Sequence, residues 1–150
     1  MNILMTSKDR DMFYSGDLGA GIVIDEKTST IAALTDLSHG TGKYPLIRIT
    51  KVNLPKEYLK SGTKLAIAGA FQRMGKYPFW NYFDPIPLIS GLKYPESHQH
   101  KIEQIPLAEW KKLEFEIDKL NDVPKEGYYP IDIETSSWKD IDIDSIKWVK

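Results

Sequence analysis

Short runs of β-branched and aliphatic residues, separated by turn-forming residues, restrict the fold of this chain more than any other feature of its sequence. Runs of this type predict strands, which we expect at 21–24, 30–34, 46–52, 63–71 and 85–90. The first two flank a polar segment and therefore predict a hairpin. The last contains Pro85 and Pro87, and proline is tolerated in a sheet only where its missing N–H is not needed, so we place this strand at an edge.

Residues 106–121 fit two periodicities. The apolar residues with helical spacing are Leu107, Trp110, Leu113, Ile117 and Leu120. The shorter stretch 113–118 alternates apolar with polar residues, as a strand would. Strong helix formers fill the whole window and Pro106 suits a helix start, so we favour a helix. A short helical turn is also expected at 54–59, where Pro55 suits the first helical position.

These elements predict a β-rich α+β fold, either a small antiparallel sheet or a partly open barrel, with one helix at about 106–121. The length of 150 residues fits a single domain over 1–150. The chain has no cysteine, which excludes disulfides, thiol catalysis and thiolate zinc sites. No apolar stretch approaches the roughly 18 residues of a membrane span, and the first residues do not resemble a secretory signal. We therefore expect a cytoplasmic protein.

Two segments near the C-terminus, 131–134 and 141–144, alternate isoleucine with acidic residues, which predicts two strands whose isoleucines face a core. If these strands paired, five carboxylates would share one outer face: Asp132, Glu134, Asp140, Asp142 and Asp144. A solvated outer face is the common explanation of such a pattern. Like charges opposite one another destabilise a sheet, however, and this cost gives added weight to a binding surface for a basic partner.

Motifs of cofactor and metal chemistry are incomplete. The Gly42-Lys43 pair lacks the earlier glycine of a phosphate-binding loop, since Leu37 stands in its place, and it lacks the serine or threonine that should follow the lysine. Asp140–Asp144 begins like a calcium loop, but Ser145 stands where that loop requires glycine. His98 and His100 could bind a metal from one face of a strand, although Pro95 and Ser97 favour an exposed loop there. We therefore expect no catalytic residue, no metal and no cofactor.

A basic, aromatic-rich region precedes the acidic end of the chain. Its cations include Lys43, Arg48, Lys51, Lys64, Arg73 and Lys76, and its aromatic residues are Tyr44, Phe71, Tyr77, Phe79, Trp80 and Tyr82. Cationic grooves with stacking aromatic rings hold single-stranded nucleic acid, so this region supports an alternative function. The net charge of −1 and the usual burial of aromatic residues in β proteins argue against it.

A non-catalytic protein-binding module is the function that these observations favour. Its concrete form is a bacterial immunity or inhibitor protein that neutralises a basic toxin or nuclease through an acidic C-terminal surface. The residues expected to contact the partner are Asp132, Glu134, Trp138, Asp140, Asp142 and Asp144. A small barrel that binds single-stranded nucleic acid is the first alternative, and a small enzyme with an unrecognised site is the second.

Overall fold

The computed structural model describes residues 18–38, 40–91, 95–120 and 122–150. Its strands are β1 (Gly19–Asp25), β2 (Thr30–Asp36), β3 (Pro45–Lys51), β4 (Lys64–Gln72), β5 (Tyr82–Pro87) and β6 (Gly127–Pro130). Its α-helices are α2 (Pro95–Gln104) and α3 (Leu107–Asp118), and 3-10 turns lie at Lys56–Tyr58, Leu88–Ser90, Ser137–Asp140 and Ile143–Ser145. The predicted β-rich α+β fold is therefore confirmed.

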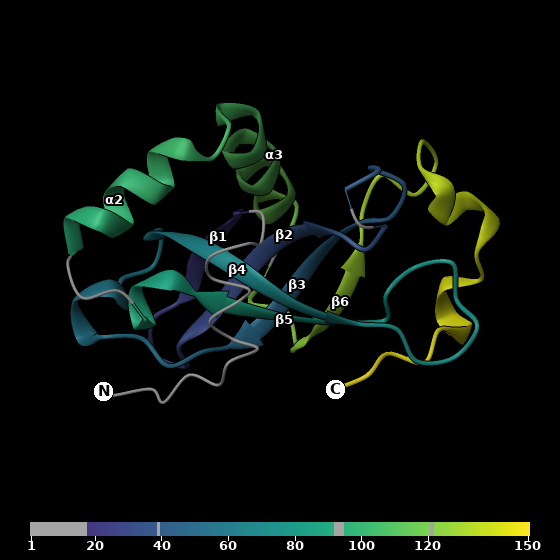
Figure 1. Ribbon diagram of the computed structural model, residues 1–150. Helices are drawn as coiled ribbons and strands as arrows, with labels where there is room; N and C mark the ends of the chain where they lie inside the picture. The colour runs from purple at the N-terminus through teal and green to yellow at the C-terminus, as the bar shows by residue number, and fades with distance from the viewer. Residues whose placement is uncertain (1–17, 39, 92–94, 121) are drawn as a thin grey trace.

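All six strands form one antiparallel sheet, in the order β5-β4-β1-β2-β3-β6, and this sheet curls into a half-barrel (Figure 1). β1 and β2 form the predicted hairpin. Asp25 stabilises its turn, because the carboxylate accepts hydrogen bonds from the Lys27 amide at 3.1 Å and the Thr28 hydroxyl at 2.8 Å. β5 lies at an edge of the sheet, as Pro85 and Pro87 predict.

Both faces of the sheet are covered by apolar side chains. Along β4, Leu65 belongs to one buried cluster and Ala66 to the other, as the alternation of a strand requires. The face of Ala66, here called the helix face, is covered by α2 and α3, with Trp110 in its cluster (Figure 1). The opposite face, here called the C-terminal face, is covered by residues 73–81 and by the C-terminal segment, residues 131–150.

Arg48 connects strands that are far apart in the sheet order. Its guanidinium lies 4.3 Å from the centre of the Tyr128 ring and donates hydrogen bonds to three carbonyl oxygens. These belong to Ile49 at 2.9 Å, Gly127 at 3.1 Å and Phe83 at 3.2 Å. The amide of Phe83 also donates to the Tyr128 hydroxyl at 3.2 Å. Because β5 and β6 are the two edge strands, these contacts hold the curl of the half-barrel across its C-terminal face.

The helical interpretation of 106–121 is confirmed by α3. Trp110 and Leu113 are 4% and 0% exposed, whereas Phe115 is 57% exposed. A strand over 113–118 would have placed Leu113 and Phe115 on the same face. Helical geometry separates them, and the burial of Trp110 and Leu113 against the sheet decides between the two periodicities.

Three predictions for the second half of the chain were wrong. Residues 131–134 and 141–144 form turns and a 3-10 helix rather than strands, so the sheet face of five carboxylates does not exist. The edge of β3 is already occupied by β6, which ends at Pro130, and Asp132 has a φ of 51°, outside the β region. The exposed loop expected around Pro95 is instead the start of α2.

Candidate functional site

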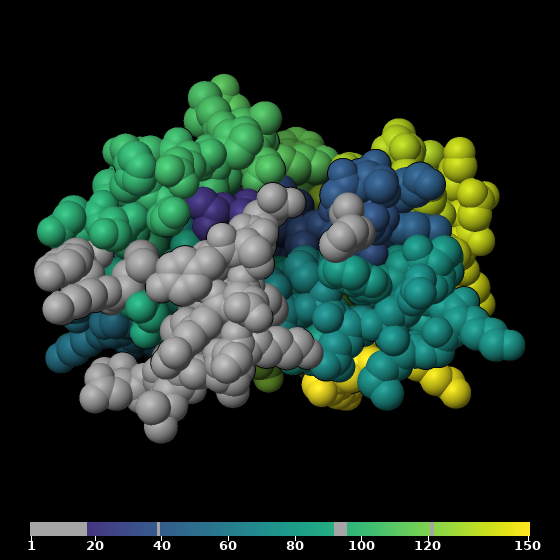
Figure 2. Space-filling view, in the orientation of Figure 1, coloured from purple at the N-terminus to yellow at the C-terminus, as the bar shows by residue number. Residues whose placement is uncertain are grey.

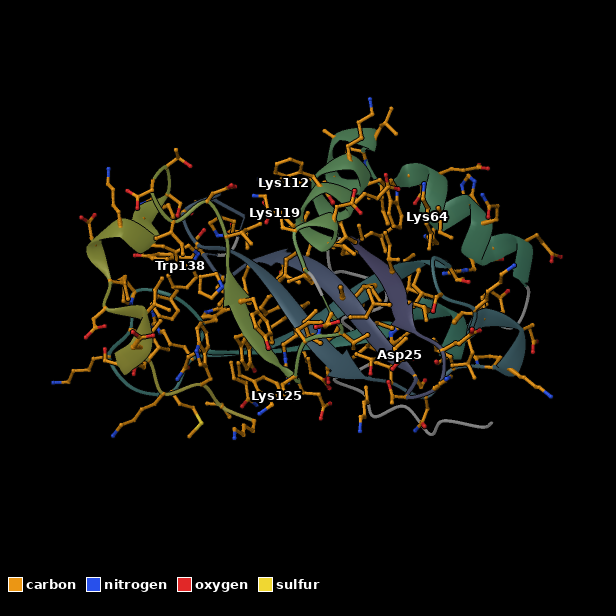
Figure 3. The ribbon with its side chains drawn as sticks, turned by 180° about the vertical axis from the view of Figure 1, so that it is seen from behind. Asp25, Lys64, Lys112, Lys119, Lys125 and Trp138 are labelled. Atoms are coloured by element: carbon orange, nitrogen blue, oxygen red, sulfur yellow. The ribbon has the colours of Figure 1, made fainter. Side chains whose placement is uncertain are left out.

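Trp138 anchors the C-terminal segment to the sheet. Its ring is 0% exposed, and its indole N–H donates to the carbonyl oxygen of Pro45 at 2.6 Å. The ring makes edge contacts with Tyr44 and Phe79, at centroid distances of 4.9 and 5.0 Å. Figure 3 shows Trp138 in the C-terminal segment, on the opposite side of the molecule from Lys64. The expectation that Trp138 lies on a partner-binding surface is therefore not met, because the ring belongs to the core.

The last residues of the chain are held by the buried side chain of Asn81. Its amide nitrogen donates to the carbonyl oxygen of Lys147 at 2.9 Å, and its backbone carbonyl accepts from the Val149 amide at 3.0 Å. The Tyr128 hydroxyl donates to the carbonyl of Val149 at 2.7 Å, and the Tyr128 ring stacks on Trp148 at 4.4 Å. The C-terminal segment is thus held in its first half by Trp138 and in its second half by the contacts of Lys147, Trp148 and Val149.

Four predicted carboxylates are exposed on this anchored segment: Glu134, Asp140, Asp142 and Asp144. Ile141 and Ile143 are half-buried and pack against the apolar cluster of the C-terminal face. In 140–144 isoleucine therefore lies inward and aspartate outward, as predicted, although the backbone is irregular with 3-10 turns instead of a strand. In the first segment the prediction fails for Ile133, which is 43% exposed. Within the described residues, none of the four carboxylates takes part in an ion pair. They are called the acidic surface below.

The fifth predicted carboxylate, Asp132, is part of a different group. It accepts a 2.7 Å hydrogen bond from the Lys112 ammonium, which also lies 3.2 Å from the carboxylate of Glu116. Burial lowers the pKa of Lys112, but these two carboxylates outweigh burial and hold that pKa above its usual value. The group joins α3 to the turn after β6, and Figure 3 shows Lys112 on that helix and Lys119 just beyond its end.

A cavity of about 630 Å³ lies beside this group, where β1 begins and β2 and β4 end. Its apolar wall contains Leu18, Leu34, Phe71, Trp80, Phe83 and Ile131, and its charged lining residues are Asp36, Glu109, Lys112 and Asp132.

The carboxylate of Asp36 accepts hydrogen bonds from the Gly42 amide at 2.7 Å and the Tyr44 amide at 3.1 Å. Burial raises the pKa of Asp36, but these bonds and those from Ser38 outweigh it and keep the pKa below its usual value. Sequence reasoning missed this cavity, because its walls come from segments that are distant in the chain.

Several residues of the basic, aromatic-rich region are occupied by contacts within the fold. The Arg48 guanidinium is occupied by Tyr128 and by carbonyl oxygens, and the rings of Tyr44 and Phe79 are buried. The ring of Phe71 stacks on Phe83 at 4.9 Å instead of standing free. The cations that remain exposed include Lys43, Lys51, Lys64, Arg73 and Lys76.

His98 and His100 lie on α2, and a helix directs residues two apart to different sides. His98 is buried, and its Nε2 accepts a hydrogen bond from the Ala66 amide at 3.0 Å. His100 is exposed and contacts the Gln104 amide at 3.1 Å. Among the described residues, no three acidic or histidine side chains are grouped so that they could hold a metal ion.

Figure 2 shows helices α2 and α3 at the upper left of the molecule and the C-terminal segment at its right. Over the part of the chain that the structure describes, neither helix combines the length and apolar character needed to cross a bilayer.

Comparison with known proteins gives a fold relative and a family. A crystal structure described as that of "a putative membrane protein from Corynebacterium diphtheriae" is similar to this chain, with a TM-score of 0.63 and 16% sequence identity. The likeness covers 77% of this chain and 100% of that one, and at this identity it shows the fold alone. No curated protein matches the sequence. The model of a family described as "Protein of unknown function (DUF3239)" matches residues 5–121, and the chain therefore belongs to that family.

Proposed function

We propose that this chain is a non-catalytic protein-binding module whose acidic surface docks on a basic partner. In its most concrete form, it is a bacterial immunity or inhibitor protein that neutralises a cationic toxin or nuclease. The observation that carries the proposal is the exposure of Glu134, Asp140, Asp142 and Asp144 on a segment that the core holds in place.

Anchoring matters because binding costs conformational entropy whenever an interface must become ordered. Trp138 and Ile146 lie in the core on either side of the three aspartates, with exposures of 0% and 8%. The aspartates are therefore presented before a partner arrives, and little further ordering of this segment is required. A fixed group of like charges also accelerates association with an oppositely charged protein.

The ionic state of the acidic surface supports the same conclusion. Lys112 and Asp132 form an ion pair with 2.7 Å between the ammonium nitrogen and a carboxylate oxygen. The four carboxylates of the acidic surface, in contrast, lack an ion-pair partner among the described residues. A basic partner would supply the missing countercharge without breaking an existing ion pair. Interfaces that exchange water for a matched countercharge gain specificity and a faster association rate.

The test uses the product of the reading frame beside the gene for this chain, expressed in a bacterial host with and without the chain. We expect that product to be toxic and the chain to restore growth. The variant Asp140→Lys, Asp142→Lys and Asp144→Lys should fold normally but lose rescue. Its affinity for the purified partner should fall by roughly two orders of magnitude, mainly through slower association.

The matched control carries Glu26→Lys, Glu57→Lys and Asp118→Lys, which make the same change in net charge at exposed positions elsewhere. This control should keep rescue and affinity. A neighbouring product without toxicity, or rescue that survives reversal of the three C-terminal aspartates, would contradict the proposal. Tight, salt-sensitive binding of a labelled oligothymidylate by the wild-type chain would support the nucleic-acid alternative instead.

A further inference from the structure

We propose that a second cavity, between α2 and the start of β4, binds a small molecule through an oxygen atom that accepts a hydrogen bond from Nδ1 of His98. The cavity has a volume of about 320 Å³, within the range of roughly 300–1,000 Å³ that is typical of small-molecule sites. It is called the α2 cavity below. Six described residues line it: Tyr58, Thr63, Lys64, His98, Gln99 and Ile102. This site is separate from the acidic surface and does not depend on the function proposed above.

The fold determines which nitrogen of His98 carries the proton. The Ala66 amide donates a hydrogen bond to Nε2 at 3.0 Å, and only a ring nitrogen without a proton can accept one. The proton of the neutral imidazole therefore lies on Nδ1. Because the side chain is 2% exposed and held between α2 and β4, it offers this N–H as a donor in a fixed position.

The Nδ1 donor has no acceptor within the described parts of the chain. There, His98 makes the bond to Ala66 and an edge contact with the Tyr58 ring, at a centroid distance of 5.7 Å. No described side-chain nitrogen or oxygen is both fully enclosed and without a hydrogen-bond partner, so Nδ1 must reach open space. The α2 cavity is the space that His98 lines. A buried donor without an acceptor costs free energy, and an oxygen atom of a ligand would recover it.

The other lining groups also favour a ligand that accepts hydrogen bonds. The ammonium of Lys64, like Nδ1 of neutral His98, can only donate. The hydroxyls of Tyr58 and Thr63 and the amide of Gln99 can donate or accept. Among the described lining residues there is no carboxylate. The lining therefore has more obligate donors than obligate acceptors, and an acceptor oxygen is the group that complements it.

Lys64 decides the charge of the head group but is not required for the proposal. Its ammonium lies 3.8 Å from the Glu114 carboxylate, which is longer than a hydrogen bond, and 5.1 Å from the centre of the Trp110 ring. Both side chains of the ion pair are about half exposed, and exposed pairs of this kind are weak. Figure 3 shows Lys64 on the side of the molecule that α2 and α3 cover. The ligand oxygen can thus belong to a neutral carbonyl group or to a carboxylate.

A short aliphatic body suits the rest of the cavity. Ile102 is half-buried and packs with the apolar cluster of the helix face, and the half-buried Tyr58 ring packs with the cluster of the opposite face. Both side chains line the α2 cavity and give a ligand apolar contact on two sides. A chain of a few carbon atoms with one oxygen-bearing head group fits this volume.

The experiment compares three probes that share a propyl body and differ in head group: 2-pentanone, butanoate and butylamine. NMR titration of the full chain follows the imidazole Nδ1 and its proton at a pH where His98 is neutral. We expect 2-pentanone and butanoate to bind with dissociation constants on the order of 1 mM and to shift the Nδ1 resonances. Butylamine, which has no acceptor, should bind at least roughly tenfold more weakly. Tighter binding of butanoate than of 2-pentanone identifies an anionic head group, and the reverse order identifies a neutral one.

Gln99→Trp tests the location of the site, because Gln99 is exposed on α2 and its larger replacement fills the cavity. It should lower the affinity of both oxygen-bearing probes at least roughly tenfold. Gln104→Trp is the matched control, since Gln104 is exposed on the same helix but does not line the cavity. The control should bind like the wild type. The titration of the wild-type chain needs no variant, so the proposal can be tested even if Gln99→Trp does not fold.

Three results would overturn the proposal. They are Nδ1 resonances that none of the probes shifts, butylamine binding as tightly as 2-pentanone, and equal affinities in Gln99→Trp and Gln104→Trp. The first would show that Nδ1 bonds only to water. Each of them would leave the protein-binding proposal unaffected, because that proposal concerns the acidic surface and is tested by rescue of growth.

Discussion

The backbone amide of Ala66 donates a 3.0 Å hydrogen bond to Nε2 of His98, and the imidazole is only 2% exposed. An imidazolium ion has no acceptor nitrogen, so this bond requires a neutral His98 with its proton on Nδ1. Burial lowers the pKa of His98 and favours that form. The bond therefore joins α2 to β4 only while the ring is uncharged.

We expect the free energy of unfolding to decrease as the pH falls below about 6.5, the ordinary pKa of histidine. His98 takes up a proton there in the unfolded chain, while the folded chain resists protonation, so the unfolded state binds more protons. The contribution is complete above the unfolded pKa and is lost as the pH falls towards the lower, folded-state pKa. The slope from this one group cannot exceed about 1.4 kcal/mol per pH unit, and it can be measured by urea unfolding at several pH values.

His98→Gln removes the titrating group but keeps an amide acceptor, so its unfolding free energy should depend less on pH than that of the wild type. His100→Gln is the matched control, because His100 lies on the same helix but is exposed. The control should follow the wild type throughout. If the free energy of unfolding depended on pH equally in all three proteins, the role assigned to His98 would be contradicted.

Gly69→Ala should destabilise the fold by about 1–3 kcal/mol, because the added methyl group overlaps the rings of Phe71 and Phe83. These rings must move, and the apolar wall of the larger cavity, which contains both of them, changes as well. Thermal unfolding measures the stability. Gly127→Ala is the control, since its Cβ would meet the Tyr129 ring at an ordinary 3.5 Å, and it should change stability by no more than about 0.5 kcal/mol. Equal effects of the two substitutions would refute the packing argument.

Arg48→Lys should lower the free energy of unfolding by about 1–3 kcal/mol, although it preserves the charge. A lysine cannot reach the carbonyl oxygens of Ile49, Gly127 and Phe83 together, because it lacks the planar fork of donors. Arg73→Lys changes an exposed arginine in the same way and should have little effect. Urea unfolding compares the two, and a harmless Arg48→Lys would show that the three carbonyl bonds are dispensable.

Trp138→Ala should cost about 3–5 kcal/mol, the usual loss for removing a large buried aromatic side chain. Trp138→Phe should cost less, since a ring still contacts Tyr44 and Phe79 while the hydrogen bond to Pro45 is lost. Calorimetric unfolding gives both values. Leu107→Ala is the control, because Leu107 is 64% exposed, and it should have little effect. A small cost for Trp138→Ala would mean that the C-terminal segment is not an integral part of the core.

The fold class could be predicted because short-range patterns determine most of its elements. The hairpin of β1 and β2 follows from two apolar runs around a polar turn, and the edge position of β5 follows from Pro85 and Pro87. The helix α2 could not be predicted in this way. Its sequence is polar, so it lacks an apolar face that would indicate a buried helix. Its buried side chain is that of His98, whose hydrogen-bond partner is a backbone amide on the distant strand β4.

The candidate sites show a similar division. The outward direction of Asp140, Asp142 and Asp144 agrees with their alternation with isoleucine, although the backbone there is irregular and contains 3-10 turns instead of a strand. The burial of Trp138 does not follow from sequence, because its partners Pro45 and Phe79 are far away in the chain. The cavity was missed for the same reason, since Phe71, Asp36 and Lys112 become neighbours only after the sheet has curled.

The large sequence separation between the C-terminal segment and its contacts also affects the order in which the protein folds. Trp138 bonds to a residue 93 positions earlier, and Arg48 bonds to one 79 positions later, whereas the β1–β2 hairpin closes over a few residues. Contacts of such high sequence separation must overcome a larger loop-closure entropy before they yield any stabilisation. During synthesis, the ring of Phe79 stays without its contacts to Trp138 and Trp148 until those residues have left the ribosome. The C-terminal face should therefore form last, and its completion should set the folding rate.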